Sequence, residues 1–181
     1  GDLAGYIQTN IMSMTDGHLY FDNDLFSQGR RPSINPFLSV TRVGRQTQAD
    51  SKRSISRELL TFLTLFDKMQ NIVHFGSELT ESVRVIIETG NKILQLFDQD
   101  ANKIIPSNVQ PIILSFLWGQ DLRRMEVTKL IYIRDKMTEM YQKDPNYKKL
   151  IDTIVLQATS FNDILARVEQ NAKQFGIETK Q

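Results

Sequence analysis

A long run of apolar residues at helical spacing occupies the middle of the chain and constrains its fold more than any other feature. Its members are three or four residues apart: Ile55, Leu59, Phe62, Phe66, Met69 and Val73. Lysine and arginine side chains fall off this stripe. Such spacing predicts an amphipathic helix with one face packed on a core. The chain must therefore supply further apolar helix faces to cover it.

The rest of the chain after residue 48 continues the helical pattern. The sequence predicts further helices over 79–97, with a break at Gly90, and over 109–118, 126–142 and 146–174. Gly76 is expected to end the first helix, and Ser77 with Glu78 to begin the next. The polar residues 98–103 read as a loop. Residues 49–181 are therefore predicted to form an all-helical bundle with its own core.

The first 48 residues have a different composition, with five of the nine glycines and two of the five prolines. Two short β-prone pieces, "IMSM" (11–14) and "HLYF" (18–21), flank Thr15-Asp16-Gly17, which is a hairpin or tight-turn signal. A further strand is predicted over Ser39–Val43. So few short strands cannot bury a sheet on both faces, and 1–48 therefore reads as the end of a larger sheet domain.

Composition excludes several classes of protein. The 181 residues are 40% hydrophobic and 24% charged, enough for one sizeable core or two small ones. The longest apolar stretch, "PIILSFLW" (111–118), is far below the roughly 20 residues of a membrane span, and no secretory leader is visible. A net charge of +1 argues against non-specific nucleic-acid binding. Cysteine is absent, and no paired His, Asp or Glu spacing suggests a metal site.

Arg42 is the residue most in need of an explanation. In the predicted strand it shares a face with Leu38 and Val40, an apolar face with no use of its own for a guanidinium. An unpaired buried charge is costly, and arginine cannot lose its proton. Two interpretations follow from the residues: Arg42 pairs with a local carboxylate, or it is held for an anion supplied from outside.

Four motifs occur in a fixed order without gaps: "YIQTNIMSMTDGHLYF" (6–21), "LFSQGRRPSIN" (25–35), "LSVTRVGRQTQ" (38–48) and "FGSEL" (75–79). Together they resemble the C-terminal third of the α subunit family of F-type ATP synthases. That family typically shows Tyr-Ile-Pro-Thr-Asn, Ser-x-Thr-Asp-Gly, Gly-x-Arg-Pro-x-Ile-Asn and Ser-Val-Ser-Arg-Val-Gly. The resemblance is strongest over 1–48 and continues, mostly as pattern and helix lengths, over 49–181.

The resemblance implies a fold and a division of the sequence. The fold class is mainly α: residues 1–48 would be the C-terminal edge of an α/β P-loop nucleotide-binding domain, and residues 49–181 the C-terminal helical bundle. The sequence contains no G-x-x-x-x-G-K-[ST] phosphate loop. The chain is therefore expected to be a fragment that has no enzyme activity of its own and binds ATP weakly or not at all.

The resemblance also implies roles for individual residues. Arg42 would be an arginine finger that reaches the nucleotide held by a β subunit, and Thr41 replaces the usual serine before it. The Ser13 hydroxyl would support phosphate or Arg42, or be satisfied by the backbone as an ordinary strand serine. Arg31, Pro32 and Gln99 would line the adenine and ribose of a non-catalytic nucleotide site. Ala101 stands where a second glutamine is usual, which places that site in doubt, and Arg30 reads as a solvated turn residue.

Cofactors and partners follow from the same resemblance. The parent complex would use ATP or ADP with magnesium, and no cofactor is expected in the fragment. The expected partners are the β subunit of an α₃β₃ head and the central-stalk γ subunit, which "GSELTES" (76–82) would face. The complex would lie peripherally at the cytoplasmic face of a bacterial inner membrane, with an organellar inner membrane as the alternative. The fragment alone is expected to self-associate or to have a poorly ordered N-terminal part.

Two other functions remain open at this point. The protein could be an α-like helical adaptor outside any rotary ATPase, an idea motivated by Ala101 and by the weaker match after residue 49. It could also belong to a related export or flagellar ATPase. The pairing of Arg-Pro-x-Ile-Asn with Ser-Val-Thr-Arg-Val-Gly is the α pattern and disfavours the second idea.

Overall fold

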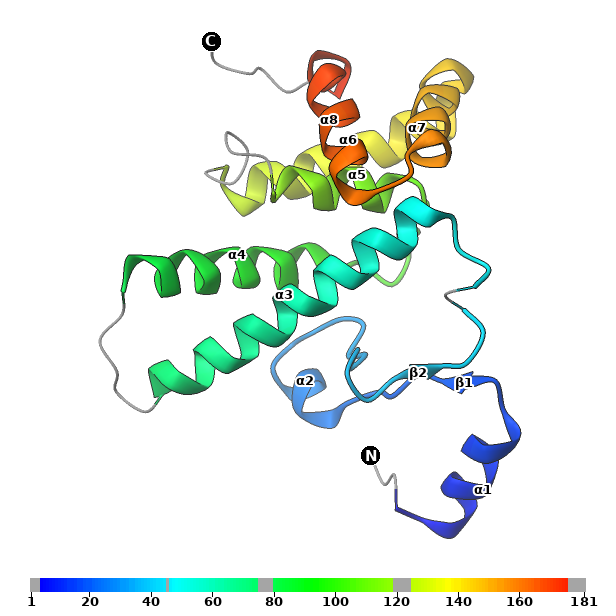
Figure 1. Ribbon diagram of the computed structural model, residues 1–181, viewed down its shortest axis with the longest axis vertical. Helices are drawn as coiled ribbons and strands as arrows, with labels where there is room; N and C mark the ends of the chain where they lie inside the picture. Colours follow the sequence, from blue (N-terminus) through cyan, green and yellow to red (C-terminus); the bar gives the residue numbers. More distant parts are fainter. Residues whose placement is uncertain (1–3, 45, 75–79, 119–124, 176–181) are drawn as a thin grey trace. The chain divides into compact units, whose positions relative to one another are not determined.

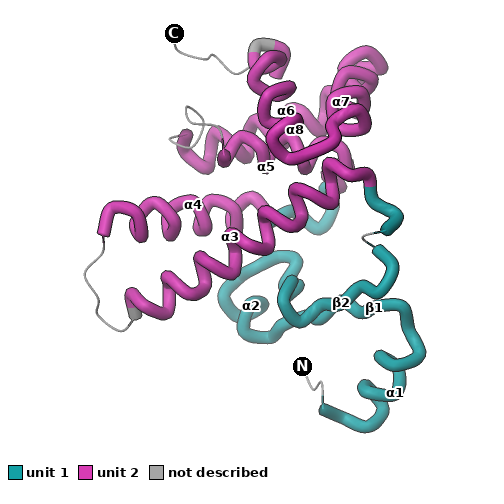
Figure 2. Tube along the Cα trace, viewed as in Figure 1, with its two compact units in different colours: residues 1–48, 97–103 teal, residues 49–96, 104–181 magenta. Residues whose placement is uncertain are grey.

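The computed structural model (Figure 1) divides the chain into two compact units, which Figure 2 distinguishes by colour. Unit 1 comprises Gly1–Gln48 and Phe97–Lys103, and unit 2 comprises Ala49–Leu96 and Ile104–Gln181. The structure describes residues 4–44, 46–74, 80–118 and 125–175. None of the helices in these ranges combines the length and the apolar character that a bilayer crossing requires.

Unit 2 is helical, which confirms the mainly α fold class. Its elements are α3 (Asp50–His74), α4 (Glu81–Phe97), α5 (Val109–Phe116), α6 (Val127–Lys143), α7 (Pro145–Gln157), α8 (Phe161–Gln170) and the 3₁₀ turn η1 (Ala172–Phe175). The predicted end of the first helix at Gly76 and the predicted start of the next at Ser77 and Glu78 lie outside the described residues.

The core of unit 2 lies among α5, α6, α7 and α8. Ile112 and Phe116 of α5, Leu130 of α6, Ile151 of α7 and Ile164 of α8 all have 0% exposed surface. Each fully buried side chain of this size stabilises the fold by roughly 1.5–3 kcal/mol. The helix faces that the apolar spacing predicts therefore meet one another.

Aromatic rings join α3 to this core. The Trp118 ring, just beyond α5, meets the Phe62 ring of α3 edge to face at a centroid distance of 5.7 Å. It meets the Phe161 ring of α8 in the same manner at 5.4 Å. Edge-to-face pairs of this kind add about 0.5–1.5 kcal/mol beyond their buried area.

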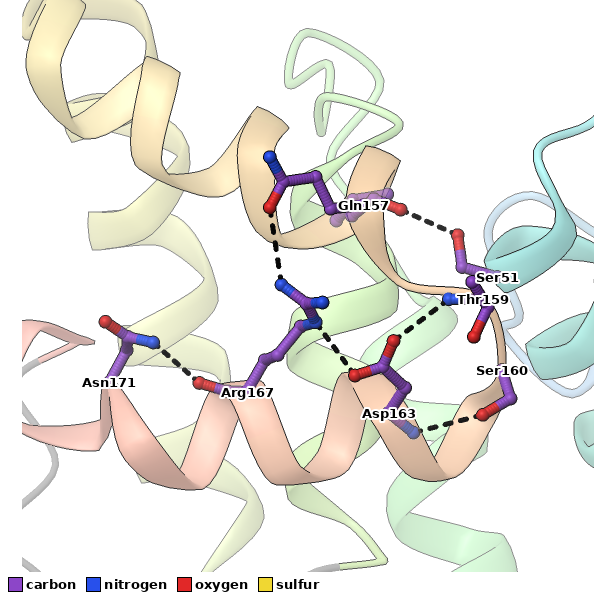
Figure 3. A network of polar contacts seen from close by, with 8 residues as sticks. Ser51, Gln157, Thr159, Ser160, Asp163, Arg167 and Asn171 are labelled. Carbon is purple, nitrogen blue, oxygen red and sulfur yellow. Dashed lines mark hydrogen bonds and ion pairs between the residues drawn. The ribbon is translucent and has the colours of Figure 1, made fainter.

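The prediction of one helix over 146–174 is wrong, because the helical path breaks between α7 and α8 (Figure 3). Ala158 is extended, and the Ser160 hydroxyl accepts a hydrogen bond from the Asp163 backbone N–H. The Asp163 carboxylate accepts in turn from the Thr159 N–H at 3.1 Å. Ser-x-x-Asp is therefore a helix-start signal inside the apolar stripe, and it ends the earlier helix.

An ion pair stabilises this new helix start. Arg167 donates from Nε to Asp163 Oδ1 at 2.8 Å and from Nη1 to Gln157 Oε1 at 3.4 Å, as Figure 3 shows. The bond to Arg167 is the main reason that the pKa of Asp163 lies below its ordinary value. The pair therefore connects the end of α7 to the first turns of α8.

The predicted break at Gly90 is also wrong, because this glycine lies inside α4 and is buried. A Cβ atom there would overlap the Phe66 ring of α3. Phe66 itself is only 4% exposed. Glycine is required at this position because the two helices approach closely, and the apolar packing outweighs its cost of about 1 kcal/mol in a helix interior.

Unit 1 contains α1 (Tyr6–Met14), β1 (Gly17–His18), α2 (Asn23–Ser27) and β2 (Val40–Thr41). The strand predicted over "IMSM" is wrong, since these residues form the second half of α1. The Thr9 hydroxyl donates to the Gly5 carbonyl, and the Ser13 hydroxyl donates to the Thr9 carbonyl, which supports the helical turns locally. Four alternating residues were too few to distinguish a strand from a helix face.

The strand predicted over "HLYF" (18–21) is much shorter in the structure, where β1 includes only His18 of these residues and Phe21 forms an isolated bridge with Ile34. The partner of β1 is not the preceding segment. β1 pairs antiparallel with β2, with Gly17 opposite Thr41 and His18 opposite Val40. A Cβ atom on Gly17 would lie 2.5 Å from the Val40 carbonyl oxygen, so this close approach requires glycine. Thr15-Asp16-Gly17 therefore leads from α1 into a strand rather than closing a hairpin.

Candidate functional site

Arg42 follows β2 directly and is exposed. Its backbone N–H donates to the Asp16 carbonyl oxygen at 2.8 Å, which fixes the backbone beside the end of α1. Leu38 and Val40 are 40% and 49% exposed. The apolar face that raised the question about Arg42 is thus not buried in this chain, and the guanidinium incurs no desolvation penalty from it.

The Arg42 guanidinium contacts backbone carbonyl oxygens. Nη1 donates to the Ser13 oxygen and Nη2 to the Met12 oxygen, both at 3.4 Å. Among the described residues, no carboxylate lies within ion-pairing distance of Arg42. The interpretation of Arg42 as one half of a local ion pair is therefore wrong for the described part of the protein.

Ser13 lies in the last turn of α1 and is exposed. Its hydroxyl donates to the carbonyl oxygens of Thr9, at 2.8 Å, and Asn10, at 2.9 Å. The hydroxyl thus makes local backbone bonds, which was the simpler of the two interpretations of this serine. The Ser13 carbonyl, rather than its hydroxyl, contacts Arg42.

The predicted nucleotide residues Arg31, Pro32 and Gln99 lie together although they are far apart in sequence. The Gln99 backbone N–H donates to the Arg31 carbonyl oxygen at 2.9 Å, and the Arg31 N–H donates to Asp98 Oδ1 at 3.2 Å. The peptide bond between Arg31 and Pro32 is cis. The two hydrogen bonds place the 97–103 segment beside Arg31, within unit 1.

The Arg31 side chain stacks on Phe26 of α2. The centre of its guanidinium lies 3.6 Å from the ring centroid, a close cation–π contact. Nη1 also donates to the carbonyl oxygens of Phe26, at 2.9 Å, and Arg30, at 2.7 Å. Sequence reasoning missed Phe26, although "LF" precedes the Arg-Pro motif by a few residues and the aromatic type was the available signal.

Arg30 is not the solvated turn residue that the sequence indicated. It is partly buried, and its guanidinium lies 6.0 Å from the centroid of the Phe97 ring. Burial lowers the pKa of Arg30 below its ordinary value, and the nearby Asp98 carboxylate opposes that shift. Ala101, in the same segment as Phe97 and Asp98, is exposed.

None of these residues lines the hollow that the structure shows on α7. An open hollow of about 340 Å³ on α7 is lined by Lys148, Lys149, Asp152 and Leu156, together with Pro145, Thr153 and Gln157. No group of three or more metal-ligating side chains occurs in the part of the protein that the structure describes. In the segment expected to face a central stalk, Glu78 lies outside the described residues, and Glu81 pairs with Arg84 at 2.7 Å.

Comparison with known proteins matches most of this sequence to one family. The family model described as "ATP synthase alpha/beta chain, C terminal domain" matches residues 48–175. ATP synthase subunit alpha of Mycoplasmopsis synoviae (strain 53) is 30% identical over 170 residues, which are 94% of this chain and 32% of that protein.

Two further relatives give similar values. ATP synthase subunit alpha of Ligilactobacillus salivarius (strain UCC118) is 31% identical over 154 residues, 85% of this chain and 30% of that protein. The Lactococcus lactis subsp. cremoris (strain MG1363) protein of the same name gives the same identity and coverage. The chain thus spans about a third of the length of the curated relatives it matches.

Proposed function

This protein belongs to the family of C-terminal domains of ATP synthase alpha and beta subunits, and from that premise we propose that it supplies an arginine finger, Arg42, to a catalytic site on a neighbouring β subunit. Its similarity to alpha subunits supports the alpha-type assignment. The observation that carries the proposal is the exposed Arg42 guanidinium, whose described contacts are neutral carbonyl oxygens. Its positive charge remains available to an anion.

The chemistry of phosphoryl transfer suits such a group. In the transition state, negative charge spreads over the equatorial oxygens of the transferred phosphoryl group. A cation whose contact with these oxygens is strongest in the transition state lowers the barrier. A guanidinium is planar, permanently charged and able to contact two phosphate oxygens at once. Arg42 would act from outside the subunit that holds the nucleotide, so this chain provides the charge and its partner provides the remaining machinery.

Magnesium and the phosphate loop would belong to that partner. The sequence has no phosphate-loop motif, and the described residues contain no set of metal-ligating side chains. This chain would contribute to ATP hydrolysis only through that partner.

A second, partial nucleotide site would lie around Arg31, Pro32 and Gln99. The bond between the Gln99 N–H and the Arg31 carbonyl supports it, because it brings the two predicted segments together. The Arg31 guanidinium, however, already stacks on Phe26 and donates to two carbonyls. With Ala101 offering no amide to a base, this site would recognise adenine or ribose weakly.

The proposed setting is the α₃β₃ head of a proton-translocating ATP synthase. The β and γ subunits would be direct partners, and the assembled complex would attach peripherally to the cytoplasmic face of a bacterial inner membrane. Ser13 would act through its backbone carbonyl on Arg42 rather than through its hydroxyl, which already donates to Thr9 and Asn10.

The test replaces Arg42 by Lys and by Ala in the intact ATPase assembly and measures steady-state ATP hydrolysis. Arginine fingers contribute about 10³–10⁵ in rate, so Arg42→Ala should lower turnover by at least about a thousandfold. Lysine keeps the charge without the bidentate geometry and should recover little of it. Arg53→Ala is the matched control, because this half-buried arginine of α3 pairs with Asp50 at 3.6 Å.

Near-normal turnover in both Arg42 variants, with the assembly intact by size-exclusion chromatography, would remove the finger assignment. That outcome would favour the second candidate, an α-like adaptor outside a rotary ATPase. One observation supports this candidate: unit 2 has a core of its own, in which Ile112 and Ile164 are fully buried. An adaptor needs a stable helical domain and no presented guanidinium.

A further inference from the structure

We propose that the last turn of α1 is a holding position for the Arg42 guanidinium, and that a phosphate group withdraws Arg42 from it and thereby loosens the end of α1. This inference rests on the proposed function and deepens it. It names the groups that position Arg42 before it meets phosphate: the backbone carbonyls of Met12 and Ser13.

The end of α1 has a physical need for a cation. The last four carbonyls of a helix have no partner within the helix, and they carry the negative end of its dipole. α1 has no basic residue in its own last turn. Arg42 donates to two of these carbonyls from a position 29 or 30 residues further along the sequence. The Thr15 hydroxyl also donates to the Met12 carbonyl, at 3.4 Å, so Arg42 adds a cation to a neutral local cap.

α1 depends on this contact more than most helices would. It has nine residues, none of them buried, and isolated helices shorter than about 12 residues are marginal in water. Its apolar side chains lie largely in solvent, with Ile7 68% and Ile11 56% exposed. A change at the C-terminal carbonyls should therefore be visible in the last turn itself.

Distances show which part of Arg42 can move. The backbone bond from the Arg42 N–H to the Asp16 carbonyl is short, at 2.8 Å, whereas both guanidinium bonds are long, at 3.4 Å. A guanidinium normally bonds a charged oxygen at about 2.7–2.9 Å, and such bonds are roughly twice as strong as neutral ones. A phosphate oxygen should therefore displace the two carbonyls while the backbone of Arg42 stays in place.

The experiment measures amide hydrogen exchange by NMR in the full 181-residue protein. Arg42→Gln should speed exchange of the Asn10–Met14 amides about two- to fivefold, the equivalent of a typical helix-end charge interaction. Arg42→Lys should retain part of the protection. Arg53→Gln, which removes a half-buried arginine of α3, is the control and should leave these amides unchanged.

A second arm tests withdrawal in the unmodified protein and does not depend on a variant. Tripolyphosphate should speed exchange of the same amides and shift the Arg42 Nε resonance, with no exchange effect in Arg42→Gln. Sodium chloride at equal ionic strength should do neither. An equal effect of chloride would mean simple screening and would overturn the proposal.

Three further outcomes would also overturn it: α1 amides that show no protection in the unmodified protein, protection that Arg42→Gln leaves unchanged, and an Arg42 resonance or α1 exchange that does not respond to tripolyphosphate. The finger assignment fails separately. Near-normal ATPase turnover of Arg42→Ala in the assembly, combined with the expected exchange results, would rule out the arginine-finger role and still support the holding position at the end of α1.

Discussion

The two units of this protein use their apolar residues in opposite ways. In unit 2 these residues build a core, with side chains such as Phe116 and Leu130 fully buried. Among the described residues of unit 1, only Ser33 is buried. Eleven of the sixteen exposed large hydrophobic residues in the described ranges lie between Tyr6 and Val43.

The two units differ in whether their own residues cover their apolar side chains. The apolar stripe of a helix is buried when neighbouring helices of the same protein pack against it, as α5, α6, α7 and α8 do against one another. A strand of two residues, such as β2, pairs with β1 along one edge and has exposed apolar neighbours. The described part of unit 1 thus presents its arginines from short elements held by backbone and side-chain hydrogen bonds.

The largest effect should come from the core of unit 2. Phe116→Ala removes a fully buried ring and should lower the free energy of unfolding by about 3–5 kcal/mol. Urea unfolding followed by far-ultraviolet circular dichroism measures this loss. Phe37→Ala in unit 1, where the ring is 51% exposed, is the matched control and should change it by less than about 0.5 kcal/mol. Equal losses in the two variants would break the contrast between the units.

The helical half of the fold was largely predictable because its signal is repeated many times. Stripes of apolar residues placed α3, α5 and α6 close to their observed bounds. The predictions of helix boundaries were wrong at positions where a single local contact determines whether a helix ends. The Ser160 cap divides a continuous stripe, and the Phe66 ring makes Gly90 a packing residue rather than a break.

The sequence motifs singled out the residues of the candidate site but did not indicate the contacts that these residues make. The motifs brought out Arg31, Gln99 and Arg42, and the structure joins Arg31 to Gln99 through their backbones. Nothing in the sequence pattern signalled that Arg42 would meet the end of α1, since "IMSM" alternates like a strand. The assignment of 1–48 as a domain edge and the roles of these residues stay predictions.

A smaller effect should follow from filling the close approach of α3 and α4. Gly90→Ala drives a Cβ atom into the buried Phe66 ring. Overpacking costs about 1–3 kcal/mol, and the better helix propensity of alanine offsets about 1 kcal/mol. Urea unfolding should therefore show a net loss of up to about 2 kcal/mol.

Two further variants extend this measurement. The loss should shrink when Gly90→Ala is combined with Phe66→Leu, since the two changes share one contact. Gly17→Ala, which places a Cβ atom against the Val40 carbonyl in unit 1, should disturb the β1–β2 pairing and leave the main unfolding transition in place. A Gly90→Ala variant as stable as the unmodified protein would contradict the close approach.

The smallest effect separates a buried tyrosine of unit 2 from an exposed one of unit 1. Burial raises the pKa of Tyr147 from its ordinary 10.0 to about 12, so the folded state holds the phenol proton more tightly than the unfolded state does. The resulting stability is complete below pH 10 and is lost as the pH rises toward 12. Relative to Tyr147→Phe, the unmodified protein should lose about 1–2 kcal/mol across that window, measured by urea unfolding at pH 9 and at successive steps above it. Tyr6→Phe, at a ring that is 83% exposed, should follow the unmodified protein at every pH, and a Tyr147→Phe variant that did the same would show that this phenol is not shielded from water.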